Sequence, residues 1–231
     1  MKLFAHRGAS REYPENTLLA FREAMKAGAK FFELDIHLTK DEVFVVCHDD
    51  KINRVSNGDV EITRNHYDDL KKYDFGRGEQ LPTLEQVLDL FEAHMTVNVE
   101  IKNIGEITRV HSLREILKRY NHLSFIISSF DHGYVYAMEE IDVKNQFKYG
   151  LLFEKGQIER EINLFGIMSH IDYLHLPYID VNQEILRRVN NLGMQVNVYT
   201  VDDLKILKKL QNLGVFGVFT NRPELVAKIE A

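Results

Sequence analysis

Acidic side chains and histidines interrupt apolar, strand-like runs near the start of this chain. The segment FFELDIHL places Glu33 and Asp35 among large apolar residues, and the next such run ends in CHD at 47–49. An unpaired carboxylate costs several kcal/mol to bury, so two on one strand need a compensating partner. Either a bound cation or a set of ion pairs would compensate them.

A third carboxylate lies on another strand-like run. Because side chains alternate between the two faces of a strand, Glu33 and Asp35 share one face. In the run 96–102, Glu100 and Lys102 likewise share a face. Neighbouring strands lie about 4.8 Å apart, so the three carboxylates can converge on one point. Three oxygen ligands suit a hard cation, and we predict one divalent ion, Mg²⁺ or Ca²⁺, bound by Glu33, Asp35 and Glu100.

A buried ion-pair network is the competing interpretation, with Lys102 balancing the acids. Three carboxylates against one lysine leave an excess of negative charge, which a cation would remove. Zinc is disfavoured because the cluster holds no thiolate and the histidines come from flanking elements.

Two histidines and two cations surround the predicted metal site. His6 and Arg7 end the first strand-like run in AHRG, His48 ends the run after the acidic strand, and Lys102 follows Glu100. Arginine and lysine beside a divalent cation are typical of a phosphate site. Two histidines with pKa values near neutrality can act as general base and general acid on either side of the phosphorus. A lone histidine is more often structural, so this hypothesis requires that all four residues lie at one end of the fold.

Eight strand-like runs alternate with helical segments and would hold these residues together. The runs are 2–6, 31–38, 96–102, 124–130, 147–153, 172–179, 195–201 and 214–220. The helical segments are 15–29, 82–94, 105–120, 131–142, 157–169, 182–193, 202–214 and 224–231. This alternation predicts an α/β fold, a (β/α)₈ TIM barrel that occupies 1–231 as a single domain. A doubly wound open sheet is the competitor, but no GxGxxG follows the first run.

One strand-like segment breaks the alternation. DEVFVVCHD at 41–49 follows the second strand too closely for a parallel crossover, so we expect a β-hairpin there. A polar insertion continues from it, so that about 41–81 would lie over the C-terminal mouth of the barrel, where such enzymes hold their catalytic groups. Cys47 should face away from His48 and pack.

Composition and charge limit the classes of function. The net charge is −6 and the basic residues are spread along the chain, which argues against nucleic-acid binding. No run approaches the roughly 20 apolar residues of a membrane span, and the start lacks the apolar stretch of a signal peptide. The one cysteine, Cys47, suits a reducing compartment. We therefore expect a cytoplasmic protein without stable membrane association; a homo-oligomer is neither indicated nor excluded.

Several motifs, in order along the chain, resemble those of the glycerophosphodiester phosphodiesterase family. They are AHRGAS, PENTLLAF, ELDIHLTKD, VVCHD, LPTLEQVL, NVEIK, SSF, YTV and FTNRP, between residues 5 and 223. The spacing of HRG, PENT, ELD and HD is the most specific part. The resemblance implies a (β/α)₈ barrel that uses a divalent metal to hydrolyse glycerophosphodiesters to sn-glycerol 3-phosphate and an alcohol.

The resemblance implies the same roles for the residues already singled out. The metal ligands would be Glu33, Asp35 and Glu100, the acid and base His6 and His48 in either order, and the phosphate ligands Arg7 and Lys102. Glu15 and Asn16 of PENT would shape the first loop rather than take part in the chemistry. Phe130 and Tyr199 would line the substrate pocket, although packing in the core explains either residue as well.

Two positions depart from the family pattern, and other functions stay open. Tyr199 stands where many relatives have Trp and Asp202 where many have Asn, both expected near the barrel mouth. One alternative is a lysophospholipase D-type hydrolase that acts on lysophospholipids; another is a non-catalytic phosphodiester-binding barrel; a third is a metal-dependent barrel enzyme of other chemistry. The sequence does not determine the head group, the choice of metal, the order of the two histidines or the formation of a cyclic phosphate.

Overall fold

Strands and helices alternate along the chain in the computed structural model, which describes residues 1–161 and 170–229. The strands are β1 (Lys2–His6), β2 (Phe31–Leu38), β3 (Phe44–Val46), β4 (Thr96–Asn103), β5 (Ser124–Ser129), β6 (Lys148–Leu152), β7 (Tyr173–Pro177), β8 (Gln195–Tyr199) and β9 (Gly217–Thr220). The α-helices are α1 (Leu18–Lys26), α2 (Tyr67–Leu70), α3 (Leu84–Leu88), α4 (Val110–Arg119), α5 (His132–Ile141), α6 (Ile158–Glu161), α7 (Gln183–Asn191), α8 (Leu204–Leu213) and α9 (Val226–Ile229). The predicted helices 157–169 and 224–231 lie partly outside the described residues.

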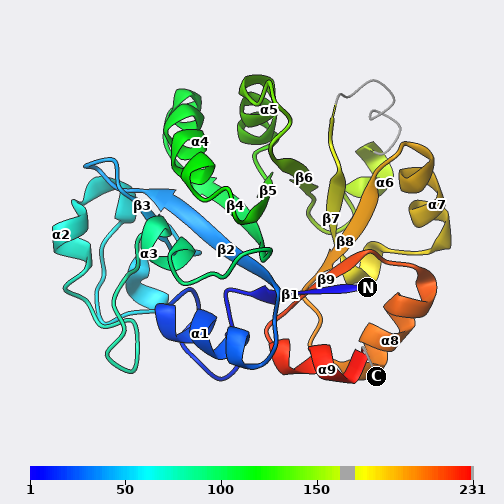
Figure 1. Cartoon of the computed structure of the whole chain (residues 1–231), viewed down its shortest axis with the longest axis horizontal. Helices are drawn as coiled ribbons and strands as arrows, with labels where there is room; N and C mark the ends of the chain where they lie inside the picture. Colours follow the sequence, from blue (N-terminus) through cyan, green and yellow to red (C-terminus); the bar gives the residue numbers. More distant parts are fainter. Residues whose placement is uncertain (162–169, 230–231) are drawn as a thin grey trace.

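Eight parallel strands of the described chain close into a barrel. Their order around the ring is β1, β9, β8, β7, β6, β5, β4 and β2, and β2 pairs with β1 to close it. Helices lie around the outside of these strands, and β3 lies beyond the ring (Figure 1). The predicted (β/α)₈ barrel is confirmed.

Several predicted strands and helices are longer than the elements that the structure contains. The predicted strand 214–220 starts only at Gly217, because Gly214 with φ 91° caps α8 in the left-handed conformation. The predicted helix 82–94 begins as expected, at a Thr83–Gln86 capping box, but α3 is only five residues long. The chain turns away from the helical path before β4, where His94 has a φ of 69°.

The predicted β-hairpin is present, and the segment after it has its own small core. β3 runs antiparallel to β2, with Ile36 opposite Val46. The following segment contains two short 3₁₀ helices and α2, at one side of the barrel in Figure 1. These elements bury a cluster formed by Val45, Cys47, Ile52, Ile62, Leu70, Phe75 and Leu81. Cys47 therefore packs as expected. The insertion has a largely polar sequence, but it encloses a small apolar core.

The two faces of the barrel wall differ in chemistry. On β4, Val97, Val99 and Ile101 pack in the outer core toward the helices. Inside the barrel, Phe4 and Phe219 pack together, with ring centroids 4.9 Å apart, and form an apolar cluster with Ile126. The polar residues of β2 and β4 lie nearer the C-terminal ends of these strands. Among the described residues, no helix is both long and apolar enough to cross a membrane.

Candidate active site

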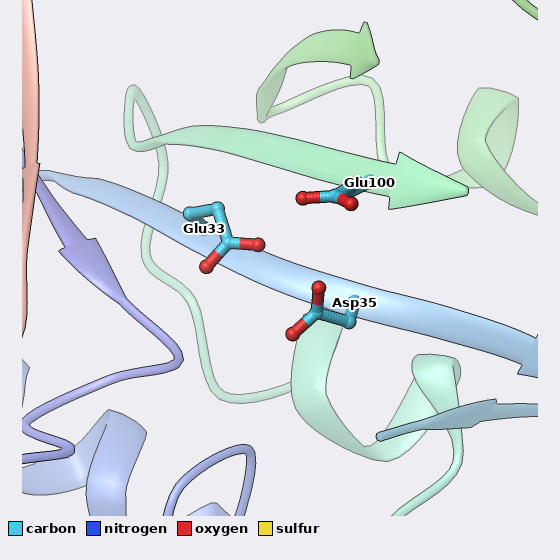
Figure 2. A group of neighbouring side chains, drawn as sticks. All are labelled: Glu33, Asp35 and Glu100. Atoms are coloured by element: carbon cyan, nitrogen blue, oxygen red, sulfur yellow. The ribbon is translucent and has the colours of Figure 1, made fainter. Parts of the chain in front are cut away.

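The three predicted metal ligands lie together inside the barrel. Figure 2 shows the carboxyl groups of Glu33 and Asp35 on β2 and of Glu100 on β4 facing a common space. Oxygens from all three lie within 4.8 Å of one another, and each residue is at most 6% exposed. The register explains this, since parallel pairing sets Asp35 beside Glu100 and Glu33 beside Asn98. Such a buried set of oxygen donors fits Mg²⁺ or Ca²⁺.

Two cations partly neutralise the cluster. Arg7 Nε lies 3.1 Å from Asp35 Oδ2, and Lys102 Nζ lies 3.1 Å from Asp35 Oδ1. Lys102 also pairs with Glu100. Lys102 is therefore not the one positive charge beside the three carboxylates, as the sequence indicated, because Arg7 contributes a second. With all three carboxylates ionised, one negative charge remains in excess, and Glu33 Oε1 is buried without a hydrogen-bond partner in the part of the chain that the structure describes. That orphaned oxygen fits a bound cation better than a completed ion-pair network.

The carboxylates differ in how strongly they hold a proton. Burial and the neighbouring Asp35 raise the pKa of Glu100 to about 7 and that of Glu33 well above its usual value. Burial also acts to raise the pKa of Asp35, but Lys102 and Arg7 outweigh it and hold that pKa far below its usual value. The metal-free cluster therefore retains protons that a cation would replace.

This proton binding predicts how metal and pH act on stability. A carboxyl whose pKa is raised on folding stabilises the fold below its unfolded pKa, and this contribution is lost as the pH rises through the folded value. For Glu100 the loss falls between its ordinary pKa of 4.5 and about 7. We expect the rise in melting temperature given by Mg²⁺ or Ca²⁺ to be larger at pH 8 than at pH 5.5, with protons released on binding near pH 7. Melting curves with metal and with chelator measure this; an equal rise at both pH values would contradict it.

The turn after β1 directs Arg7 toward the acids. Arg7 has a φ of 57°, and its N–H donates at 3.0 Å to both the backbone and the side-chain oxygen of Glu33. Gly8, with a φ of 81°, follows in the same turn, and a Cβ there would lie 2.6 Å from the backbone of Ala20. The HRG motif is therefore a tight turn that packs on α1 and returns the guanidinium to β2.

His6 is held in one tautomer by Asn221. His6 Nδ1 lies 2.7 Å from Asn221 Oδ1, and the Asn221 amide nitrogen donates to Asp202 at 2.8 Å. Because Asp202 fixes which end of the amide faces His6, the proton belongs on Nδ1 and Nε2 is free. Burial and the adjacent Arg7 lower the pKa of His6 to about 4, so the ring is neutral at pH 7. Asp202, expected near the mouth, follows the C-terminal end of β8 and orients this partner of His6.

His48 is held from two sides. Its Nδ1 lies 2.5 Å from Asp49 Oδ1, and its backbone oxygen accepts a hydrogen bond from His37 Nε2 at 3.1 Å. Arg54 Nε in turn donates to Asp49 at 2.5 Å. The carboxylate therefore keeps the proton on Nδ1, leaves Nε2 for a ligand, and can stabilise positive charge on a protonated ring.

The loop carrying PENT also contacts the site directly. Asn16 donates to Asp35 at 2.8 Å, and the carboxylate of Glu15 accepts from both Arg7 and Arg54. Glu15 therefore links the first loop to the insertion after β3, and both residues orient groups of the site. This linkage was not inferred from sequence, since Arg7, Glu15 and Arg54 lie on three separate segments.

One cavity of about 230 Å³ brings most of the predicted residues together. Its lining includes His6, Arg7, Glu33, His48, Asn98, Glu100, Lys102, Phe130, Leu152, Glu154, His175, Tyr199, Thr200 and Phe219. Asp35 is not part of this lining and lies beneath its two cations. Phe130 and Tyr199 meet edge to face, with centroids 6.2 Å apart, and both line the cavity rather than serving the core alone.

Comparisons with known proteins agree with this geometry. The sequence model of the glycerophosphoryl diester phosphodiesterase family matches residues 6–225. A glycerophosphodiester phosphodiesterase of Caldanaerobacter subterraneus is 31% identical, and the match covers 98% of this chain and 96% of that protein.

Solved structures are similar over the same length. The glycerophosphodiester phosphodiesterase of Thermotoga maritima is 32% identical with a TM-score of 0.81, and the match covers 98% of this chain and 97% of that one. A phosphodiesterase of Oleispira antarctica, solved with its product sn-glycerol-3-phosphate, is 25% identical with a TM-score of 0.87, covering 100% and 97%. The motif resemblance is thus confirmed: the chain belongs to the glycerophosphoryl diester phosphodiesterase family.

Proposed function

We propose that this protein hydrolyses glycerophosphodiesters to sn-glycerol 3-phosphate and an alcohol, with one bound Mg²⁺ or Ca²⁺. The observation that carries the proposal is the arrangement around one cavity: a buried carboxylate cluster with an unpaired oxygen, two cations, and two histidines each held in one tautomer. The product bound to the Oleispira antarctica relative supports the choice of substrate class.

The phosphate would be held between the carboxylate cluster and the two cations. Glu33, Asp35 and Glu100 would hold the metal ion, which when bound supplies positive charge against the phosphate oxygens. Burial opposes the charge of Arg7 and of Lys102, but Asp35 raises the pKa of both above the usual values, so they stay protonated. Their guanidinium and ammonium groups would neutralise the charge that develops on phosphorus-bound oxygens in the transition state.

The surroundings of the two histidines favour one order of proton transfer. His6 is neutral with a free Nε2, so it would accept the proton of the attacking oxygen, from water or a neighbouring glycerol hydroxyl. His48, stabilised by Asp49, would donate a proton to the alcohol oxygen as its bond to phosphorus breaks. With water as the nucleophile, one phosphorus–oxygen bond forms, one breaks, and each histidine moves one proton. With the glycerol hydroxyl, the same step would give a cyclic phosphate, which a second step with water would open to sn-glycerol 3-phosphate.

The identity of the products tests the proposed reaction. Hydrolysis of glycerophosphocholine in the presence of metal should give the ³¹P signal of sn-glycerol 3-phosphate together with free choline. Phosphocholine and glycerol as products would show that the other ester bond is cleaved. A folded, metal-loaded protein that releases neither pair would contradict hydrolysis itself.

Asp49 provides a test of the histidine geometry. We expect Asp49→Asn to lower kcat by about 10-fold to 100-fold, because an asparagine amide can donate to Nδ1 and favour the wrong tautomer of His48. Asp50→Asn, at the exposed neighbouring position, is the matched control and should keep wild-type kcat. Steady-state kinetics and metal titration of both variants measure this; equal rates in the two variants would remove the role given to Asp49.

We also propose a cytoplasmic location, on the strength of the single cysteine. Cys47 is buried in the cluster of the insertion, and burial raises the pKa of its thiol to about 12, so it is an unreactive packing residue. A fold without disulfides suits a reducing compartment.

A further inference from the structure

A polar layer lines the cavity beside the metal ligands, where Asn98 pairs in register with Glu33. Asn98 on β4 and His175 on β7 both line the cavity, yet they are only 1% and 0% exposed. Below them the barrel is closed by the packed rings of Phe4 and Phe219, and the His175 ring lies 5.1 Å from that of Phe219. The proposed catalytic steps use neither Asn98 nor His175.

Two hydrogen bonds fix these side chains and leave one atom of each unpaired. Asn98 Nδ2 donates to Ser128 Oγ at 2.9 Å, and Asn197 Nδ2 lies 3.2 Å from His175 Nε2. Asn98 Oδ1, His175 Nδ1 and Asn197 Oδ1 are buried without a hydrogen-bond partner among residues 1–161 and 170–229, and the first two belong to residues that line the cavity. A buried polar atom left unpaired is destabilising, so both atoms are expected to meet a ligand or a water.

The two free atoms have complementary chemistry. Burial lowers the pKa of His175 to about 3, so the ring is neutral at pH 7. Since Nε2 accepts from Asn197, the single ring proton belongs on Nδ1, which is a donor. Asn98 Oδ1 is an acceptor. A hydroxyl group can accept from the first and donate to the second, whereas an apolar or charged group cannot satisfy both.

Glycines leave the room that this layer needs. A Cβ at Gly150 on β6 would lie 2.5 Å from His175 Nε2, and a Cβ at Gly217 on β9 would overlap Asn197 Oδ1. Any larger residue at either position would displace the histidine or its partner. Residues of six strands, β4 to β9, therefore form this layer or leave room for it.

We propose that Asn98 and His175 form a subsite that binds the terminal hydroxyl of the substrate's glycerol moiety. This inference rests on the proposed function, in which the phosphate lies at the metal cluster beside this subsite. The closed floor admits the small alcohol end of glycerol but no chain beyond it. Lysophospholipids acylated on that hydroxyl would lose the hydrogen bond donated to Asn98 Oδ1 and would place a hydrocarbon chain against the packed Phe219.

The test compares two substrates that differ only in this hydroxyl. They are glycerophosphocholine and the analogue in which a methyl group replaces the terminal hydroxymethyl. In the wild-type protein we expect kcat/KM for the analogue to be at least about 10-fold lower, since two buried polar atoms stay unpaired. In Asn98→Leu and His175→Phe, the ratio of kcat/KM for glycerophosphocholine to kcat/KM for the analogue should fall toward one. The main cause would be loss of activity on glycerophosphocholine. Asn190→Leu, at an exposed position of α7, is the control and should keep the wild-type ratio.

Two outcomes would overturn the subsite. A wild-type ratio near one would mean that a permanent water satisfies the two atoms. A large ratio that the variants leave unchanged would assign the hydroxyl to another contact, such as the metal. Melting temperature and metal titration show whether each variant is folded and loaded.

A binding measurement separates this inference from the proposed function. Calorimetry would compare sn-glycerol 3-phosphate with propane-1,2-diol phosphate, which lacks the terminal hydroxyl, on the metal-loaded wild-type protein. Preferential binding of the first, reduced in Asn98→Leu, supports the subsite even if no diester is hydrolysed. Equal binding of both, in a protein that hydrolyses glycerophosphodiesters, rejects the subsite alone.

Discussion

Glu33→Gln is expected to remove tight metal binding and to lower kcat/KM for glycerophosphodiesters by about 10³-fold without unfolding the protein. Glu33 Oε1 has no partner within the described residues, and Oε2 accepts a hydrogen bond from the Arg7 backbone. Burial and Asp35 raise the pKa of Glu33 well above its usual value, so the metal-free fold favours the neutral carboxyl group that glutamine resembles. The variant should therefore melt at or above the wild-type temperature when both are measured in chelator.

A carboxylate that serves only a structural ion-pair network would respond differently to the same substitution. If Glu33 belonged to a completed ion-pair network, its replacement would leave a buried charge unpaired and destabilise the fold by roughly 3–5 kcal/mol. Metal titration, kinetics and melting curves of Glu33→Gln therefore distinguish the two interpretations. Glu92→Gln, at an exposed position, should match the wild type in all three measurements. A destabilised Glu33→Gln that still binds metal would favour the network.

His48→Gln should lower kcat for glycerophosphocholine by about 10²-fold to 10⁴-fold, the usual contribution of general acid catalysis. If His48 donates the proton to the departing alcohol, the loss should largely vanish with a p-nitrophenyl ester of glycerol phosphate, whose leaving group departs without protonation. His6→Gln should stay slow on both substrates, because activating the attacking oxygen is needed in either case. Initial rates on the two esters provide the measurement.

The same pair of variants can contradict the assignment. Rescue of His6→Gln but not of His48→Gln by the nitrophenyl ester would exchange the two roles. Equal losses on both esters for both variants would place neither histidine at the leaving group. Metal titration is the control, since each variant should bind the ion as the wild type does.

Much of the fold and of the metal cluster could be predicted from local patterns. The alternation of apolar and polar residues in FFELDIHL assigned Glu33 and Asp35 to one face, and the structure buries both inside the barrel. The same reasoning on β4 brought Glu100 beside Asp35. Such predictions succeed because a strand has a fixed two-residue period and parallel neighbours a fixed spacing. The short gap before β3 likewise left a hairpin as the only available connection.

The residues that orient this site could not be found in this way. Asn221 lies 215 positions from His6, and no spacing rule relates them. Asp202 departs from the family pattern, and in the structure it accepts a hydrogen bond from the Asn221 amide and so orients it. His175 sits within the apolar run 172–179, where a single histidine carries no signal until the strands beside it show that Gly150 leaves room for its ring. These contacts depend on closure of the barrel, which sequence periodicity does not describe.

The insertion after β3 shows a different limit. Its apolar residues are few and irregularly spaced, so neither a helical nor a strand period marks them. They nevertheless form a buried cluster, and the same segment supplies Arg54, which holds Asp49 beside His48. A segment that looks like a polar loop thus helps to position a proposed catalytic residue.

The most direct test of the central claim is an enzyme-coupled assay for sn-glycerol 3-phosphate released from glycerophosphocholine. It would use the purified protein after chelation and again after adding back Mg²⁺ or Ca²⁺, with Glu33→Gln beside it. We predict release that stops in chelator, returns with one of the two ions, and is absent in the variant. Release that persists in chelator and in Glu33→Gln, or no release from a folded protein shown to bind the ion, would contradict metal-dependent hydrolysis at this cluster.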